Sequence, residues 1–286
     1  MAERRYAKVS DLELSYLEVE GEGTPVLYLH GWPDDATIWR HELERQALSG
    51  RSALALDWPS HGKSTQTRDL DRFAITELSD MLAAFLQIVG LDRVHLVAHD
   101  YGAVVAWDFA ACHSTHLESY TAVCIGHPAA ILRNPSVPGL LKNWFLLFNA
   151  LPGSVQLYRA ANSRFFRWAM KQHPDRLKVV ERLNASPDGF YIRVWERGNP
   201  MTDLVRDYML RRKTDIEKVD VPTFGLFSER DQYAHRPHME RSADYVNADW
   251  MFGLQRETGH WPMLQEPRDF GAHIKRWLDR VEGRLA

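Results

Sequence analysis

Asp100 is the residue of this chain whose surroundings most strongly suggest chemistry. It lies at the centre of the sequence VAHDYGA (97–103), between an apolar run and a segment with helical spacing. The small residues Ala98 and Gly102 flank it, as a tight strand–turn–helix connection that presents a nucleophile requires. Aspartate also caps many helices, because its carboxylate accepts hydrogen bonds from the first backbone N–H groups. Taken alone, the motif supports a nucleophile and a helix cap equally.

Three further motifs contain the partners that a nucleophile needs. HGWP (30–33) follows an early apolar run, where a loop can donate backbone N–H groups to an oxyanion. FSERD (227–231) ends in Asp231 after a late apolar run, and TGHWP (258–262) places His260 near the C-terminus. A single histidine or aspartate is usually structural. The chain order of nucleophile, acid and histidine is nevertheless that of the α/β-hydrolase triad.

The elements that must position these residues alternate between short strands and helices. Helical spacing runs over 75–89 and 103–111, and the apolar strand runs are 26–29, 52–56, 94–98, 120–125 and 221–227. This alternation predicts an α/β fold, with a mostly parallel sheet covered by helices on both faces.

Residues 128–214 interrupt this alternation. They contain helical patterns, aromatic residues and arginines but no comparable strand run. We expect a helical cap at 128–214, inserted into a catalytic domain formed by 1–127 and 215–286. An unrelated helical domain, or helices packed beside the sheet, is the alternative interpretation.

Composition excludes several other classes of protein. The chain has 286 residues, 45% of them hydrophobic and 26% charged, with a net charge of −3. These values are typical of a globular chain of one or two domains, without the basic excess of a nucleic-acid-binding protein. The N-terminus lacks an apolar signal segment, and no run reaches the roughly 20 apolar residues of a membrane helix. We therefore expect a cytoplasmic protein without a nucleic-acid or membrane partner, and a homodimer is compatible with its size.

The sequence offers little for a disulfide framework or a metal site. Cys112 and Cys124 are the only cysteines, and their apolar neighbours predict two buried thiols. His235 and His238 are three residues apart, but no third ligand follows at metal-binding spacing. We expect neither a metal nor another cofactor.

The motifs HGWPD (30–34), AHDYG (98–102) and GHW (259–261) resemble those of α/β-hydrolases with an aspartate nucleophile. This group includes the epoxide hydrolases and the haloalkane dehalogenases, and the bacterial epoxide hydrolases are the most similar. The resemblance extends from Leu14 to about Trp277, and it implies an α/β-hydrolase fold with an inserted cap.

An aspartate nucleophile suits substitution at a saturated carbon, such as the opening of an epoxide to a vicinal diol. Asp100 would attack the carbon and form an ester, and His260, oriented by Asp231, would activate the water that hydrolyses this ester. The backbone N–H groups of Trp32 and Tyr101 would stabilise the oxyanion that forms on the carboxyl group of Asp100.

Epoxide hydrolases usually present two cap tyrosines to the epoxide oxygen, and the resemblance supplies one of them. RDYM (206–209) makes Tyr208 the candidate acid, whereas Phe145 occupies the position of the other tyrosine. Either Tyr208 acts alone, or another polar group such as Tyr158, Tyr191 or His127 substitutes for the missing phenol. We expect a small apolar substrate, in contact with the aromatic side chains of Trp32, Trp144, Phe145 and Phe148.

Two alternative functions remain open from the sequence. A haloalkane dehalogenase would use the same nucleophile, with Trp32 and Trp144 as N–H donors to the halide. That group usually has Trp directly after the nucleophile, or Arg in fluoroacetate-type dehalogenases, where this chain has Tyr101. A protein that binds a small molecule without turnover is the other alternative, since a cap tyrosine is missing.

Overall fold

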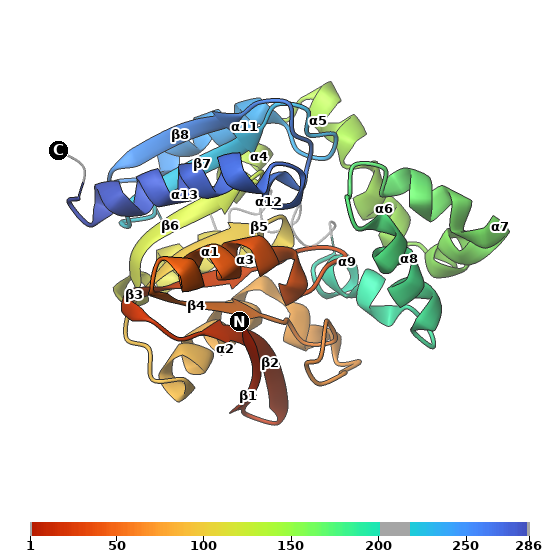
Figure 1. Ribbon diagram of the computed structural model, residues 1–286. Coiled ribbons are helices and arrows are strands. Elements are labelled where there is room, and N and C mark those ends of the chain that lie inside the picture. Colours follow the sequence, from red (N-terminus) through yellow and green to blue (C-terminus); the bar gives the residue numbers. More distant parts are fainter. Residues whose placement is uncertain (1, 201–217, 285–286) are drawn as a thin grey trace.

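The computed structural model describes residues 2–200 and 218–284, which are built around one eight-stranded sheet (Figure 1). The strand order is β1-β2-β4-β3-β5-β6-β7-β8. Strand β2 pairs antiparallel with β1 and β4, and all other neighbours are parallel. The strands are β1 (Glu3–Val9), β2 (Leu12–Val19), β3 (Glu22–Leu29), β4 (Arg51–Leu56), β5 (Val94–His99), β6 (Leu117–Val123), β7 (Thr223–Ser228) and β8 (Trp250–Gln255). The predicted fold class is confirmed.

The five strands expected from apolar runs are β3 to β7, and they form the middle of the sheet. Every residue of β5 is buried, as expected for a parallel strand covered on both faces. Strands β1, β2 and β8 were not expected, because exposed or half-buried positions interrupt their apolar residues. Apolar runs therefore identify the centre of this sheet better than its edges.

Helices cover both faces of the sheet, and the hydrogen bonds of two tyrosine hydroxyls show that α1 and α3 lie on opposite faces. Tyr28 of β3 accepts a hydrogen bond from Gln46 of α1 (3.0 Å), and Tyr120 of β6 donates one to the carbonyl of Ala103 in α3 (2.9 Å). Tyr28 pairs with Val97 of β5, which pairs with Thr121 of β6. Because successive side chains of a strand point to opposite faces, Tyr120, which precedes Thr121, points to the face opposite Tyr28. The helices outside the inserted segment are η1 (Ala36–Trp39), α1 (Arg40–Leu48), η2 (Leu70–Phe73), α2 (Ile75–Ile88), α3 (Tyr101–Cys112), η3 (Ser114–His116), α11 (Arg236–Glu240), η5 (Arg241–Tyr245), α12 (Pro262–Gln265) and α13 (Pro267–Val281).

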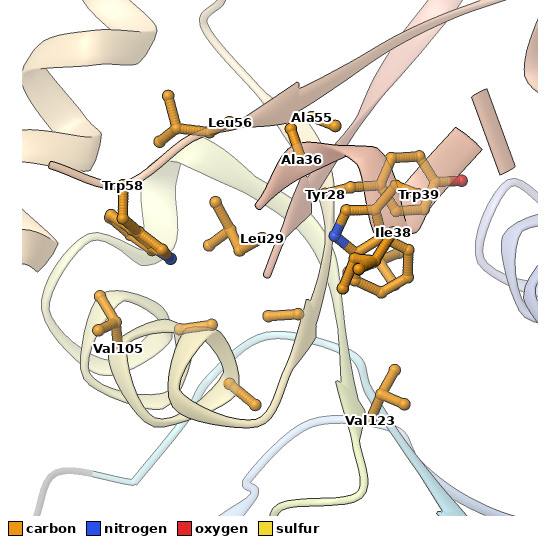
Figure 2. Packing of buried hydrophobic residues seen from close by; sticks show 14 of the residues in the cluster. Tyr28, Leu29, Ala36, Ile38, Trp39, Ala55, Leu56, Trp58, Val105 and Val123 are labelled. Atoms are coloured by element: carbon orange, nitrogen blue, oxygen red, sulfur yellow. The ribbon is translucent and has the colours of Figure 1, made fainter. Parts of the chain in front are cut away.

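The hydrophobic core is divided by the sheet into two layers. Figure 2 shows Tyr28 and Trp39 packed together on one side, where their ring centroids lie 5.0 Å apart. Leu29, the next residue of β3, lies toward Trp58 and Val105 on the other side (Figure 2). Because both layers are buried, the carboxyl ends of the central strands are held in fixed positions.

Between β6 and β7, the described residues 128–200 form helices and no strand, as the sequence predicts. Figure 1 shows α6, α7 and α8 grouped at one end of the sheet. The helices of this segment are α4 (Pro128–Arg133), α5 (Val137–Lys142), α6 (Trp144–Ala150), α7 (Ser154–Ala169), α8 (Arg176–Ala185), η4 (Phe190–Ile192) and α9 (Val194–Gly198). The cap boundaries 128 and 214 stay predictions, and the second lies outside the described residues.

Buried polar contacts fasten the cap segment to the loop that follows β3. His173 Nε2 lies 2.9 Å from Asp34 Oδ1, and both side chains are almost completely buried. Arg182 pairs with the neighbouring Asp35. The indole N–H of Trp32 donates to the carbonyl of Ile192 (2.9 Å). The cap therefore rests directly on the loop that contains HGWPD.

One expectation about the cysteines was wrong. Cys124 is buried, but Cys112 is exposed, because it is the last residue of α3 and lies at the solvent-facing end of that helix. Across the described ranges, no helix is both long and apolar enough to cross a lipid bilayer.

Candidate active site

Asp100 lies in a sharp turn between β5 and α3. Its backbone is in a strained conformation, with φ 53° and ψ −125°. A Cβ atom on Gly102 would lie 2.5 Å from the carbonyl oxygen of His30, and one on Gly31 would lie 2.5 Å from Asp100 Oδ2. The turn therefore requires glycine at both positions. Asp100 makes no capping hydrogen bond through its side chain, so helix capping is not its role.

The carboxylate of Asp100 is held by both a backbone donor and a histidine. Oδ2 accepts a hydrogen bond from the N–H of Trp32 (2.7 Å), and the N–H of Tyr101 also interacts with this carboxylate. Oδ1 lies 3.5 Å from His260 Nε2. Burial alone would raise the pKa of Asp100, but His260 and the backbone N–H groups hold it below its usual value. Asp100 is therefore an ionised carboxylate beside two oxyanion donors.

His260 connects Asp100 to a second carboxylate. Its Nδ1 lies 2.8 Å from Oδ2 of Asp231, which follows β7. Oδ1 of Asp231 accepts hydrogen bonds from the N–H groups of Tyr233 (2.7 Å) and Ala234 (2.9 Å). Burial opposes ionisation, but His260 and these donors lower the pKa of Asp231 to about 2. The charges of Asp231 and Asp100 correspondingly raise the pKa of His260 well above its usual value, against the effect of burial.

His99 and Cys124 support the histidine loop, a role that no sequence motif indicates. His99 Nε2 donates a hydrogen bond to the carbonyl of His260 (2.7 Å), and the two imidazole rings lie 4.6 Å apart. Cys124, directly after β6, places its sulfur 3.7 Å from the same carbonyl. Each of the three offers a metal-ligating atom within 4.8 Å of the others. However, the two ring nitrogens of His260 already face Asp231 and Asp100, so this cluster lacks a free ligand set.

The aromatic residues expected to contact the substrate divide into two groups. Phe145 stacks on Trp32 with ring centroids 5.9 Å apart, directly beside the oxyanion donor. Trp144 and Phe148 instead pack against each other (6.0 Å) and against Phe165 of α7, inside the cap. Among the four predicted contact residues, the structure therefore brings Phe145 and Trp32 to the site, whereas Trp144 and Phe148 are half-buried among other aromatic side chains of the cap.

The residues expected to act as ring-opening acids lie in different surroundings. Tyr208 lies outside the described residues. Tyr158 donates its hydroxyl to Asn149 Oδ1 (2.8 Å), and Tyr191 lies beside Arg182. His127 stacks on the ring of Tyr245 at 4.7 Å and accepts a hydrogen bond from the N–H of Ala129. Tyr158 and His127 are thus engaged with other groups of the protein, whereas the buried hydroxyl of Tyr191 makes no well-formed hydrogen bond within the described residues.

Glu196 is a buried carboxyl group in α9 that the sequence analysis did not identify. Its Oε1 accepts a hydrogen bond from Asn149 Nδ2 (2.8 Å). Burial raises the pKa of Glu196 to about 8, and the nearby charge of Asp100 adds to this effect. An acidic residue in a short helix has no distinctive spacing, so only the tertiary structure shows that it is buried near the nucleophile.

A family model described as alpha/beta hydrolase fold matches residues 24–267. Epoxide hydrolase 1 of Caenorhabditis elegans is 27% identical, over 97% of this chain and 70% of its own length. Epoxide hydrolase A of Mycobacterium tuberculosis is 23% identical, over 97% of this chain and 98% of its own length.

A longer relative and a solved structure that are similar to this chain are also named as epoxide hydrolases. The chain spans about half the length, 53%, of the bifunctional epoxide hydrolase 2 of Sus scrofa, with 21% identity over 94% of this chain. The crystal structure of an epoxide hydrolase from Vigna radiata superimposes with a TM-score of 0.79 at 19% identity, covering 98% of both chains. The chain therefore belongs to the α/β-hydrolase fold family, within which it resembles the epoxide hydrolases.

Proposed function

We propose that this protein hydrolyses an epoxide to a vicinal diol through a covalent ester on Asp100. The observation that carries the proposal is the position of the Asp100 carboxylate, with the Trp32 N–H 2.7 Å from one oxygen and His260 3.5 Å from the other. Relatives named as epoxide hydrolases, similar over nearly the whole chain, support the choice of substrate class.

In the first step, an oxygen of Asp100 attacks an epoxide carbon, the carbon–oxygen bond of the ring breaks, and the released oxygen takes up a proton. Tyr208 is the donor proposed from the sequence. The buried rings of Trp32 and Phe145 favour a small apolar substrate beside the nucleophile. Formation of the ester removes the negative charge of Asp100.

In the second step, His260 removes a proton from water, and the water attacks the carbonyl carbon of the ester. The loss of the Asp100 charge lowers the pKa of His260, so the imidazole becomes a base when the ester is present. Asp231 stabilises the imidazolium that forms. The N–H groups of Trp32 and Tyr101 then stabilise the oxyanion, and loss of such a donor typically costs about 3 kcal/mol of transition-state stabilisation.

The contacts of Trp32 argue against a haloalkane dehalogenase. A halide needs N–H donors directed at it, but the indole N–H of Trp32 already donates to the carbonyl of Ile192 (2.9 Å). Position 101, directly after the nucleophile, is a tyrosine whose phenol can donate a proton to an oxygen leaving group.

A panel of epoxides and of chloro- and bromoalkanes tests the proposal, with diol formation and halide release as the measurements. The wild-type protein should convert at least one epoxide class to diol. A His260→Gln variant should accumulate a substrate adduct on the Asp100 peptide, detected by mass spectrometry. Halide release without diol formation would favour the dehalogenase, and a ligand recovered unchanged after long incubation would favour a non-catalytic binder.

A further inference from the structure

The oxygen released by ring opening needs a proton, and most described phenols near the site are engaged elsewhere. Phe145, which stacks on Trp32, has no hydroxyl. Tyr158 donates to Asn149, and Tyr233, whose ring packs against His260, donates to the carbonyl of Ala169. Tyr191 has a buried hydroxyl without a well-formed hydrogen bond, but it lies beside Arg182. Tyr101, directly after the nucleophile, is the phenol influenced by both Asp100 and the carboxyl group of Glu196.

Tyr101 is held by the two consecutive cap residues Trp195 and Glu196. Its ring stacks on Trp195 with centroids 4.9 Å apart and planes inclined by 14°. The carboxyl group of Glu196 lies close enough to the Tyr101 phenol for each to affect the pKa of the other. Tyr101 is partly buried and Glu196 is buried. The cap thus fixes the plane of the phenol with one residue and places a carboxyl group close to it with the next.

Glu196 has the surroundings of a neutral carboxylic acid. Asn149 Nδ2 donates to Oε1 (2.8 Å), while Oε2 is buried and makes no well-formed hydrogen bond with the rest of the described chain. Within that part of the chain, no Lys or Arg forms an ion pair with Glu196. Burial raises its pKa to about 8, and the charge of Asp100 acts in the same direction. At neutral pH the carboxyl group therefore retains its proton and can donate it.

Asn149, which contacts Glu196, lies in the same helix as Phe145, the residue at the position of the missing cap tyrosine. Asn149 follows Phe145 by four residues in α6, so the two side chains lie on the same face of the helix, one turn apart. Phe145 covers Trp32, and Asn149 holds the carboxyl group of Glu196. The same helix face therefore places an apolar ring over the nucleophile loop and an amide on a proton-bearing group.

We propose that Tyr101 donates a proton to the epoxide oxygen and that Glu196, as a neutral carboxylic acid, returns a proton to Tyr101. This inference rests on the proposed epoxide hydrolysis. As an Asp100 oxygen bonds to the epoxide carbon, the breaking carbon–oxygen bond leaves its electron pair on oxygen, which takes the phenol proton. The phenolate takes the proton of Glu196, and water reprotonates Glu196. Ester hydrolysis releases one proton through His260, so the complete cycle neither gains nor loses protons.

Single-turnover kinetics with styrene oxide test this inference, because ester formation and ester hydrolysis are then measured separately. Tyr101→Phe should slow ester formation about 100-fold and Glu196→Gln about tenfold, and neither should slow ester hydrolysis more than about twofold. The double variant should resemble Tyr101→Phe, since both residues act on the same proton. Tyr16→Phe, which removes a phenol hydroxyl of β2 whose ring packs against Phe85, is the matched control and should remain close to the wild type.

Two further measurements separate proton donation from a structural role. Nitro-substituted styrene oxide, whose leaving oxygen is less basic, should show a smaller loss in both variants. Ester formation by the wild type should slow above about pH 8 as Glu196 loses its proton, and this decline should be absent in Glu196→Gln.

The possible outcomes distinguish the inference from the function on which it rests. If the wild type forms no ester, the proposed function fails and the inference fails with it. If the wild type forms the ester and both variants form it equally fast, only the inference is overturned. Should either variant fail to fold, the wild-type pH profile decides: a rate of ester formation constant between pH 7 and about 9 would contradict the role of Glu196.

Discussion

Two regions meet at this site, and the buried carboxyl groups of one region are in the opposite protonation state from that of the other. On the sheet side, Asp100 and Asp231 share His260 and accept backbone N–H hydrogen bonds, so their pKa values are lowered. On the cap side, Glu196 has an amide and a phenol as neighbours, and burial raises its pKa to about 8. Burial is similar in the two regions, so the difference comes mainly from His260, the cation that both carboxylates on the sheet side contact. Environments that separate pKa values in this way can provide a nucleophile and an acid in one site.

The sheet side should be the more sensitive region. Asp100→Asn removes the nucleophile with little change of shape, and we expect kcat to fall by about 10⁴-fold or more. Asp108→Asn, two turns further along α3, is the matched control and should retain nearly full activity. An Asp100→Asn protein within tenfold of the wild type, after its amide has been verified by mass spectrometry, would contradict the role of Asp100.

Asp231→Asn should affect the second step more than the first. The amide cannot stabilise the imidazolium of His260, so ester hydrolysis should slow by about 10³-fold while ester formation remains largely intact. The adduct on Asp100 should therefore accumulate, as measured by rapid quenching and mass spectrometry. A larger loss in ester formation than in ester hydrolysis would assign Asp231 to another function.

The two regions should influence stability with opposite dependence on pH. The pKa of Glu196 is raised from 4.5 to about 8, so its contribution to stability is present at low pH and is lost between these values. The wild type should lose about 3 kcal/mol of unfolding free energy relative to Glu196→Gln between pH 5 and pH 8. The pKa of Asp231 is lowered to about 2, so its contribution is present above about pH 4 and is lost on acidification.

Urea denaturation of the two proteins at each pH measures the Glu196 contribution directly. A difference in unfolding free energy that stays constant from pH 5 to pH 8 would mean that Glu196 is already ionised at pH 5. The contrast between the two regions would then be lost.

The smallest predicted effect is a gain at the cap side. Phe145→Tyr places a hydroxyl on the ring that stacks on Trp32, and ester formation should become about three- to tenfold faster, because a further proton donor reaches the leaving oxygen. Phe148→Tyr is the matched control, since Phe148 packs inside the cap against Phe165. Equal gains in the two variants, or no gain in Phe145→Tyr, would show that Phe145 does not face the leaving oxygen.

Sequence analysis was most informative where function depends on local structure. The turn at Asp100 needs Gly31 and Gly102, and Asp231 lies three residues after the end of β7, so short motifs carry the information. The structure brings these two carboxylates together with His260, as the chain order predicted. Strands β3 to β7 were recognised for the same reason, because burial on both faces requires continuous apolar runs.

The cap side depends on tertiary contacts and was predicted less well. Trp144 and Phe148 share one face of α6, whereas Phe145 and Asn149 share another, so the aromatic residues separate into two groups. Helical periodicity could have indicated this separation. The importance of Glu196 follows only from its burial beside Tyr101 and Asn149, which are distant in sequence.

The source of the diol oxygen in a first turnover tests the covalent mechanism most directly. With the protein in excess over an epoxide in ¹⁸O-labelled water, the added diol oxygen comes from Asp100, and water attacks the carbonyl carbon of the ester. The diol should therefore be unlabelled, and mass spectrometry should find one ¹⁸O in the Asp100 side chain. A labelled diol together with an unlabelled Asp100 would show that water attacks the epoxide directly, and would contradict the role of Asp100 as nucleophile.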